Sequence, residues 1–348
     1  LQQEKAKKSL DFFSVGIHKI SQDPRKQKLR SLCHPGDEKI LEAMQIFQTH
    51  MSHIPLMNLA KLQEKDPMKH MEKVYKGLTR QEIEDQYMLR NTRPGYEITD
   101  IPRWQKLSTS FRTKTPNKLD VMYGSYPRNK LDLFYPNSTP KGFILYIHGG
   151  YWQRGDKSDY NFIAEPFVKR GHSVAVMNYQ MCPDVKLIEI APQVRTAILY
   201  LWRNADCLGI PKNNFNLLGH SAGAHLTGEM VFTNWQEVDR NLPNDLINAA
   251  VAISGIYDFE PILYCSENKE IRLDKLEAKA ASTIYRQLTL NIPNIIAFGL
   301  NEPPEMQRQS IDFANVLCTA SNNTELIKIN NADHFETVDT ITDENSRL

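Results

Sequence analysis

The sequence predicts an α/β fold, in which a mostly parallel, doubly wound sheet carries helices on both faces. Three observations predict it. From residue 142 onward, short continuous apolar runs are typical of strands that are buried on both faces. Stretches with helical periodicity separate these runs, as crossovers between parallel strands require. Ahead of them, two segments of alternating apolar and polar residues flank a turn, which indicates an antiparallel hairpin at the start of the sheet.

The predicted elements follow one another in a regular order. The hairpin pairs residues 119–124 with residues 131–135 around the turn sequence YPRN at 126–129. We expect buried strands at residues 142–147, 173–178, 215–218, 249–254, 292–298 and 326–329. We expect helices at residues 190–204, 222–232 and 306–317.

The first 75 residues differ in composition from the rest of the chain. Residues 1–80 hold 15 Lys and Arg against 9 Asp and Glu, whereas the whole chain has a net charge of +1. Apolar residues at positions 40, 44, 47 and 51 predict an amphipathic helix over 37–51. We therefore expect a basic N-terminal extension over 1–75, partly helical or flexible, and a folded domain over 76–348. A capping box of Thr79 and Glu82 predicts that this domain starts with a helix over 80–87.

The composition excludes several classes of protein. The chain has 348 residues, of which 41% are hydrophobic and 24% charged, as in ordinary globular domains. The balanced charge predicts no nucleic-acid and no membrane partner, and no run approaches the ~18 apolar residues of a membrane helix. The five cysteines are widely spaced without a CxxC pair, so neither a disulfide framework nor a zinc site is expected. Because the first 20 residues lack the apolar core of a secretory signal, we expect a cytoplasmic location.

A serine motif lies between a predicted strand and a predicted helix. The sequence GHSAG at 219–223 follows the strand at 215–218, and the helix over 222–232 begins within it. The glycines permit a cramped strand-to-helix turn that exposes Ser221 above the sheet. The N-terminus of the helix favours the negative charge that develops there. The motif therefore predicts that Ser221 is a nucleophile.

A second motif follows the strand at 142–147. The sequence HGGYW at 148–152 places two glycines at the exit of this strand. A tetrahedral intermediate needs two or more backbone N–H groups aimed at its oxyanion. We expect these donors to be the N–H groups of Gly149 or Gly150 and of Ala222, the residue after the nucleophile. We expect His148 to organise this loop.

A general base and a carboxylate should complete the site. His334 lies in a polar loop after the last predicted strand, and we expect it to be the base. The acid is expected just after the strand at 292–298, where Glu302 lies. Asp258, which follows the preceding strand, is the alternative, and Glu305 and Asp333 are weaker candidates.

Taken together, these segments resemble the kynurenine formamidase (arylformamidase) family, a branch of the α/β-hydrolase superfamily. HGGYWQ at 148–153 resembles the family's HGGxW motif, and GHSAGAHL at 219–226 resembles its nucleophile elbow. DHFE at 333–336 is similar to its histidine loop. GLNEPPEMQRQS at 299–310 is similar to the segment that carries the acid, with Glu302 where many members have aspartate. LTRQEIEDQY at 78–87 and YQMCPDVKLIEI at 179–190 also resemble family segments.

The resemblance implies an α/β-hydrolase fold and the hydrolysis of N-formyl-L-kynurenine to L-kynurenine and formate, a step of tryptophan catabolism. It implies a triad of Ser221, His334 and Glu302 that needs no metal and no organic cofactor. We expect Tyr151 and Trp152 to form an aromatic wall for the anilide ring of this small-molecule substrate. For Trp152, a core position under the loop is the alternative.

Two other functions stay open. A carboxylesterase acting on small aryl or acyl esters would use the same triad. A hydrolase-fold protein that binds without catalysis would usually lack one triad residue, and all three are present here. For the assembly of the chain, a homodimer is one option.

Overall fold

The computed structural model describes residues 72–320 and 323–347. The helix predicted over 37–51, and the predicted extension apart from its last four residues, lie outside these ranges. Of those four, Lys73–Tyr75 form strand β1, which pairs with β2 (Leu78–Thr79) in a small antiparallel sheet. Tyr75 is buried, and its hydroxyl donates a hydrogen bond of 2.6 Å to Asp258. The folded domain therefore begins before the boundary predicted at residue 76.

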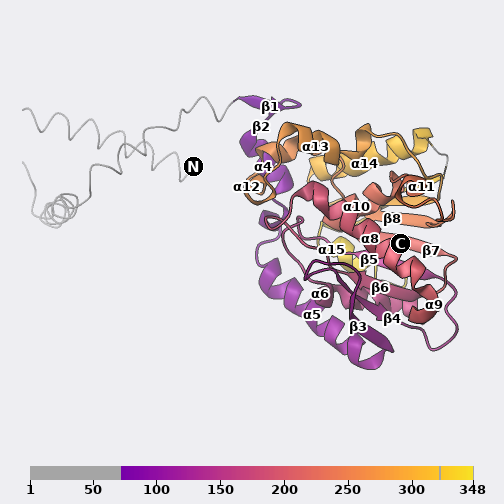
Figure 1. Cartoon of the computed structure of the whole chain (residues 1–348). Helices are drawn as coiled ribbons and strands as arrows, with labels where there is room; N and C mark the ends of the chain where they lie inside the picture. The colour runs from indigo at the N-terminus through magenta and orange to yellow at the C-terminus, as the bar shows by residue number, and fades with distance from the viewer. Residues whose placement is uncertain (1–71, 321–322, 348) are drawn as a thin grey trace, which may run out of the picture. The chain divides into compact units, whose positions relative to one another are not determined.

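An eight-stranded sheet forms the centre of the domain (Figure 1). Its spatial order is β10-β9-β8-β7-β5-β6-β4-β3. Strands β5 to β10 run parallel to one another, whereas β4 pairs antiparallel with both β3 and β6. The predicted parallel sheet with an antiparallel start is confirmed. The strands are β3 (Asn117–Met122), β4 (Lys130–Phe134), β5 (Phe143–Ile147), β6 (Ser173–Met177), β7 (Phe215–His220), β8 (Ala249–Ile253), β9 (Asn294–Gly299) and β10 (Thr324–Ile329).

Helices connect the parallel strands. The three predicted between strands are α8 (Ile190–Arg203), α10 (Ala222–Val231) and α14 (Pro304–Ala320). The predicted capping box starts α4 (Arg80–Tyr87). The other α-helices of the described residues are α5 (Tyr96–Lys114), α6 (Lys157–Tyr160), α7 (Glu165–Lys169), α9 (Ala205–Leu208), α11 (Trp235–Val238), α12 (Asn268–Ile271), α13 (Lys275–Ala281) and α15 (Glu336–Thr340). None of the helices in this part of the chain is both long and apolar enough to cross a membrane.

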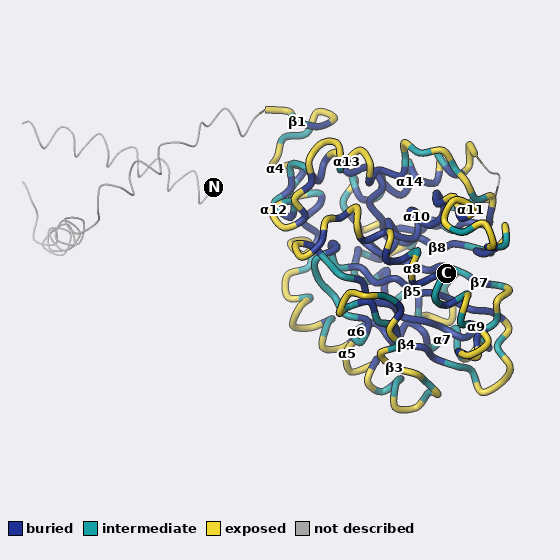
Figure 2. The backbone as a smooth tube through the Cα atoms, viewed as in Figure 1, coloured by how far each residue is buried: buried dark blue, intermediate teal, exposed yellow. Residues whose placement is uncertain are grey.

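Two apolar cores lie on the two faces of the sheet. Along β5, Phe143, Leu145 and Ile147 belong to one core, whereas Ile144 and Tyr146 belong to the other. This follows because successive side chains of a strand point to opposite faces. Helices α8, α10 and α14 contribute to the first core, and α5 and α15 contribute to the second. The dark blue tube in Figure 2 shows that the central strands are buried between these layers.

The parallel arrangement brings the proposed chemistry to one edge of the sheet. In a parallel sheet, the segments that follow the strands meet at the carboxyl edge, where α/β proteins hold their ligands. The segments after β5, β7, β8, β9 and β10 carry, in that order, Gly149, Ser221, Ser254, Glu302 and His334.

The long helix α5 was not predicted from the sequence. It begins directly after Gly95 and contains Pro102, which removes one backbone donor, so its sequence carries two signals that usually end a helix. Its buried residues include Asp100 and Ser108 beside Trp104 and Phe111. Polar residues on the inner face therefore hide the helical periodicity of this segment.

Candidate active site

Ser221 lies at the tight turn between β7 and α10. Its backbone has a φ of 56° and a ψ of −119°, a conformation that costs a non-glycine residue roughly 1–3 kcal/mol. Position 223 accepts only glycine, because a Cβ there would lie 1.9 Å from the carbonyl oxygen of Ile147. The strained turn therefore holds the serine and the N-terminus of α10 against the end of β5, as a nucleophile elbow requires.

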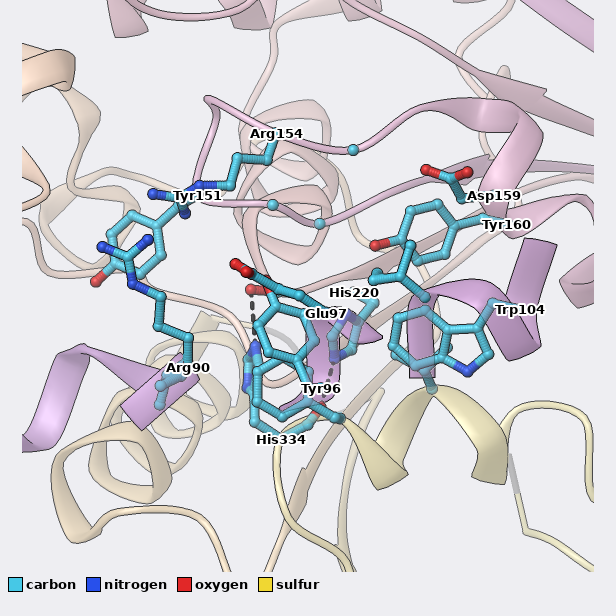
Figure 3. A pocket seen from close by; sticks show the side chains of 18 of the residues that line it. Arg90, Tyr96, Glu97, Trp104, Tyr151, Arg154, Asp159, Tyr160, His220 and His334 are labelled. Carbon is cyan, nitrogen blue, oxygen red and sulfur yellow. Dashed lines mark hydrogen bonds between the residues drawn. The ribbon is translucent and has the colours of Figure 1, made fainter. Parts of the chain in front are cut away.

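The imidazole of His334 lies between the side chains of Ser221 and Glu302 and contacts both. Nε2 of His334 lies 2.9 Å from Oγ of Ser221 (Figure 3). Nδ1 of the same imidazole lies 3.4 Å from Oε2 of Glu302. All three residues are buried. A hydroxyl, an imidazole and a carboxylate in this order can activate a serine for nucleophilic attack.

Two further hydrogen bonds hold the carboxylate of Glu302. Its Oε1 accepts from the hydroxyl of Ser254, at the end of β8. The same oxygen accepts from the backbone N–H of Gly299, at the end of β9, over 2.9 Å. Because both donors use Oε1, the other oxygen is left to face Nδ1 of His334. The carboxylate is therefore oriented by the ends of two adjacent strands.

Asp258, the alternative acid, lies elsewhere. Its carboxylate accepts from the hydroxyl of Tyr75 and lies 4.0 Å from the guanidinium of Arg308. Of the weaker candidates, Glu305 also pairs with Arg308, and Asp333 lies in the histidine loop itself. Among the described residues, only Glu302 places a carboxylate against the imidazole of His334.

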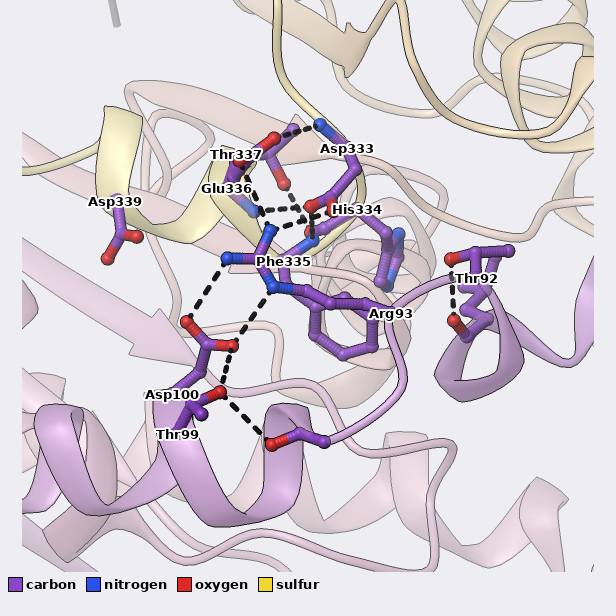
Figure 4. Close-up of polar contacts among 12 residues, drawn as sticks. Thr92, Arg93, Thr99, Asp100, Asp333, His334, Phe335, Glu336, Thr337 and Asp339 are labelled. Atoms are coloured by element: carbon purple, nitrogen blue, oxygen red, sulfur yellow. Dashed lines mark hydrogen bonds and ion pairs between the residues drawn. The ribbon is translucent and has the colours of Figure 1, made fainter.

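The loop that carries His334 is anchored on both sides (Figure 4). Oδ1 of Asp333 accepts from the backbone N–H groups of Phe335 and Glu336 over 2.9 Å each. Its other oxygen accepts from Nη1 of Arg93 over 2.8 Å, while Nε of Arg93 donates to Asp100 over 3.0 Å. Arg93 therefore ties the histidine loop to helix α5.

His220, next to the nucleophile, supports the same loop from below. Its Nε2 lies 3.0 Å from the carbonyl oxygen of His334 and 3.1 Å from Oγ1 of Thr337. The Thr337 hydroxyl itself donates to that carbonyl, so Nε2 of His220 carries the proton of a neutral ring. Burial, and next the imidazole of His334, hold the pKa of His220 well below its usual range.

The loop after β5 lies against the nucleophile. A Cβ on Gly149 would lie 2.9 Å from Cβ of Ser221, so the backbone approaches the serine as closely as glycine allows. The ring of His148 holds this loop, with Nδ1 at 2.6 Å from the carbonyl oxygen of Gly149 and Nε2 at 3.1 Å from Oδ1 of Asn178. Ala222 follows Ser221 as the first residue of α10. The expected oxyanion donors thus come from segments that meet at Ser221.

A cavity of about 270 Å³ lies above the serine and the histidine (Figure 3). Its lining comes from residues within 88–104, 149–160 and 334–338, together with His220, Ser221 and Glu267. The volume is close to the lower end of the ~300–1,000 Å³ common for small-molecule sites. A cavity that holds a paired serine and histidine can bind a small substrate and attack it.

Comparison with known proteins assigns the chain to a family. A Danio rerio protein named kynurenine formamidase is 29% identical over 286 residues, which cover 79% of this chain and 95% of the relative. The kynurenine formamidase of Salmo salar is 30% identical over 233 residues, which cover 65% of this chain and 77% of the relative. The chain belongs to the kynurenine formamidase family.

Two other comparisons agree with this membership. The family model described as BD-FAE matches residues 131–291. The solved structure of a candidate thioesterase from Silicibacter sp. has a TM-score of 0.68 at 29% identity and covers 77% of this chain and 97% of that one. This member of the kynurenine formamidase family is therefore a hydrolase with the predicted α/β-hydrolase fold.

The expected aromatic wall of this formamidase-family site needs one correction. Tyr151 lines the cavity, and its hydroxyl donates to the carbonyl oxygen of Tyr87 over 3.1 Å. Trp152 is only 1% exposed and does not line the cavity. Its ring packs against Phe259 and His225, because the turn after the two glycines directs consecutive side chains apart. Trp152 thus supports the loop from the core.

Several polar residues that line the formamidase-family cavity were missed in the sequence. They carry no motif, and they become neighbours only when the chain folds. The missed residues are Arg90, Tyr96, Glu97, Arg154 and Glu267. A weak signal for Arg154 was available, since it follows the HGGYW motif by two positions.

The acidic, histidine and cysteine side chains of this formamidase-family fold are spread over the domain. Within residues 72–320 and 323–347, no group of three or more His, Cys, Asp or Glu side chains is arranged to hold a metal ion. The groups at the carboxyl edge instead contact one another, as the pairs His334–Glu302 and Arg154–Glu267 show.

The buried His148 predicts how the stability of this formamidase-family protein depends on pH. Burial lowers the pKa of His148 to about 4 from its usual 6.5. As the pH falls, this histidine is therefore protonated in the unfolded chain before it is protonated in the folded protein. The free energy of unfolding keeps the full contribution of this group above pH 6.5 and loses it as the pH falls toward 4. We expect the free energy of unfolding to drop by about 2 kcal/mol from this group between pH 7 and pH 5. Urea unfolding at both pH values measures it, and the drop should be smaller by that amount in His148→Gln; an equal drop in both proteins would contradict the assignment.

Proposed function

We propose that this protein hydrolyses N-formyl-L-kynurenine to L-kynurenine and formate through a formyl ester on Ser221. The observation that carries the proposal is the 2.9 Å contact between Nε2 of His334 and Oγ of Ser221, within a cavity of a kynurenine formamidase family member. The proposed triad is completed by Glu302. We place the reaction in tryptophan catabolism and in the cytoplasm.

The first half of the proposed reaction forms the ester. His334 takes the proton of the Ser221 hydroxyl as Oγ bonds to the formyl carbon, and the carbonyl electron pair moves onto oxygen. The N–H groups of Gly149 or Gly150 and of Ala222 hold that oxyanion, and each such donor typically lowers the barrier by ~3 kcal/mol. Glu302 stabilises the imidazolium that forms.

The second half releases both products. The C–N bond breaks as His334 returns the proton to the aryl nitrogen, and L-kynurenine leaves with its amino group restored. His334 then removes a proton from water, whose oxygen attacks the ester carbon. Formic acid departs as Oγ of Ser221 regains its proton from His334, and it loses its own proton to solvent to give formate. The starting state of the site is restored.

The shape of the site suits a formyl group. The backbone of Gly149 packs closely against Ser221, since a Cβ on this glycine would lie 2.9 Å from Cβ of the serine. We propose that this close packing leaves a small acyl side. Tyr151, on the wall of the cavity, offers a ring against which an anilide can pack. A small acyl side next to an aromatic wall therefore favours an aryl formamide.

A second candidate is an esterase that acts on small aryl or acyl esters. The likeness to the candidate thioesterase, with a TM-score of 0.68, favours it. An ester needs the same nucleophile, base and oxyanion donors as a formamide. The two functions differ in the leaving group and in the size of the acyl group that the site accepts.

A comparison of kcat/KM for a formamide and for an ester tests the proposal. We expect kcat/KM for N-formyl-L-kynurenine, measured by release of formate, to exceed that for 4-nitrophenyl acetate. The reason is that the proposed small acyl side, beside Gly149, accommodates a formyl hydrogen more easily than an acetyl methyl group. Fast ester turnover without formate release from the formamide would overturn the proposal in favour of the esterase.

A further inference from the structure

Two arginines share one buried carboxylate at the cavity. Nη2 of Arg154 donates to both oxygens of Glu267, over 2.8 and 2.9 Å. Nη2 of Arg90 lies 3.5 Å from Oε1 of the same carboxylate. The side chain of Glu267 is 4% exposed, whereas those of Arg90 and Arg154 are 41% and 36% exposed. All three residues line the cavity that contains Ser221.

This cluster has unused positive charge. Two guanidinium groups face one carboxylate, so a single positive charge is left over. Within the described residues, the guanidinium of Arg154 donates only through Nη2, and the guanidinium of Arg90 donates no hydrogen bond within standard distance. Each guanidinium has five N–H donors in a planar fork that matches a carboxylate. The remaining donors are available to an anionic group in the cavity.

The cluster is joined to the catalytic loop. The backbone N–H of Arg154 donates to the carbonyl oxygen of Gly150 over 2.9 Å, which closes the turn after the two glycines. Nε2 of Gln153 donates to the carbonyl oxygen of Glu267 over 3.2 Å. The position of the guanidinium is therefore set by the same turn that presents Gly149 and Gly150 to Ser221.

The surroundings of Tyr96 show that charges of both signs gather there. Burial raises the pKa of the Tyr96 hydroxyl, and the carboxylate of Glu97 raises it further. The charges of Arg154 and Arg90 act on it in the opposite direction. Figure 3 shows both arginines on the side of the cavity where Tyr151 lies, away from Asp159 and Trp104. This end of the cavity suits a zwitterion, which carries a carboxylate and an ammonium group.

We propose that Arg90 and Arg154, oriented by Glu267, bind the α-carboxylate of a free amino-acid substrate while its acyl group lies at Ser221. The inference rests on the proposed function and deepens it, because it selects formanilides that carry an amino-acid side chain over neutral ones. A purely structural ion pair would need only one of the two arginines.

The test uses two substrates that differ only at the α-carboxyl group. They are N-formyl-L-kynurenine and its α-carboxamide, which keeps the formanilide but removes the negative charge. We expect Arg90→Met to lower kcat/KM for the acid about 10- to 100-fold, mainly through KM, and to change that for the carboxamide less than twofold. Arg154→Lys, which keeps a partner for Glu267 but loses the fork, should show the same selectivity. Arg240→Met, at an exposed arginine outside the cavity lining, is the matched control and should change neither substrate.

The outcomes separate this inference from the proposed function. Equal losses on both substrates, in variants that melt at the wild-type temperature, would show a structural role and overturn the inference. If neither formanilide is cleaved, the proposed function fails. The variants are then compared on O-acetyl-L-tyrosine and its α-carboxamide, which are aryl esters that carry the carboxyl group on the leaving group. A selective loss on the acid supports the subsite, and equal losses overturn it.

Discussion

Replacement of Ser221 by alanine is expected to lower the rate of formate release from N-formyl-L-kynurenine by at least about 10⁴-fold. The alanine removes the only atom that forms the proposed ester, while the oxyanion donors and the cavity remain. KM should change little, because Oγ of Ser221 contributes little to ground-state binding. Initial rates at saturating substrate measure the effect.

Ser173→Ala is the matched control for this variant. Ser173 is also a buried serine of a central strand, but it is the first residue of β6. It therefore lies at the amino edge of the parallel strands, opposite to the carboxyl edge where Ser221 lies. Its hydroxyl has no hydrogen-bond partner within the described residues, so its loss should leave the rate unchanged. A Ser221→Ala protein that keeps more than a tenth of the wild-type rate would contradict the nucleophile assignment.

The second large effect is expected for Glu302→Gln. The amide oxygen can still accept from Ser254 and Gly299, but the amide nitrogen then faces Nδ1 of His334. That donor forces the imidazole into the tautomer whose Nε2 carries a proton, so it cannot take one from Ser221. We expect kcat to fall about 10³- to 10⁴-fold with an unchanged fold. Steady-state kinetics measure the fall in kcat, and thermal melting checks that the fold is unchanged.

Asp258→Asn distinguishes the two candidate acids. Asp258 contacts Tyr75 and lies near Arg308, and within the described residues it forms no hydrogen bond or ion pair with the imidazole of His334. We expect this variant to lose some stability, because it weakens a buried network, and to keep kcat within a few-fold of wild type. A larger loss of kcat in Asp258→Asn than in Glu302→Gln would reverse the assignment of the acid.

The parts of the site that follow local rules could be predicted from the sequence. The turn at Ser221 needs glycines at fixed positions. A Cβ on Gly219 would meet the carbonyl oxygen of Gly223 in the same turn, and a Cβ on Gly223 would meet that of Ile147 in the adjacent strand. Likewise, Gly149 lies two positions after the end of its strand, and His334 follows the last strand in a short loop. Each position depends on the strand beside it, so strand order and motif together place the residue at the carboxyl edge.

The end of the cavity that is lined by Arg90, Arg154 and Glu267 could not be predicted in this way. Arg90 and Glu267 are 177 positions apart, and neither belongs to a motif. Helix α5, which carries Tyr96 and Glu97, could not be predicted either. Gly95 usually ends a helix, and the buried face of α5 is partly polar, so its sequence lacks a clear helical periodicity. Trp152 was misplaced for a related reason, since an aromatic residue beside a catalytic loop serves the core or the cavity according to the direction of one turn.

Active-site labelling tests the central claim most directly. The 348-residue chain is treated with a fluorophosphonate and then digested, and the modified peptide is identified by mass spectrometry. The account predicts one adduct per chain, on the oxygen of Ser221, with hydrolysis lost in proportion to labelling and no adduct in Ser221→Ala. Hydrolysis that persists at the full rate after labelling, or that is lost through an adduct on another residue, would contradict it.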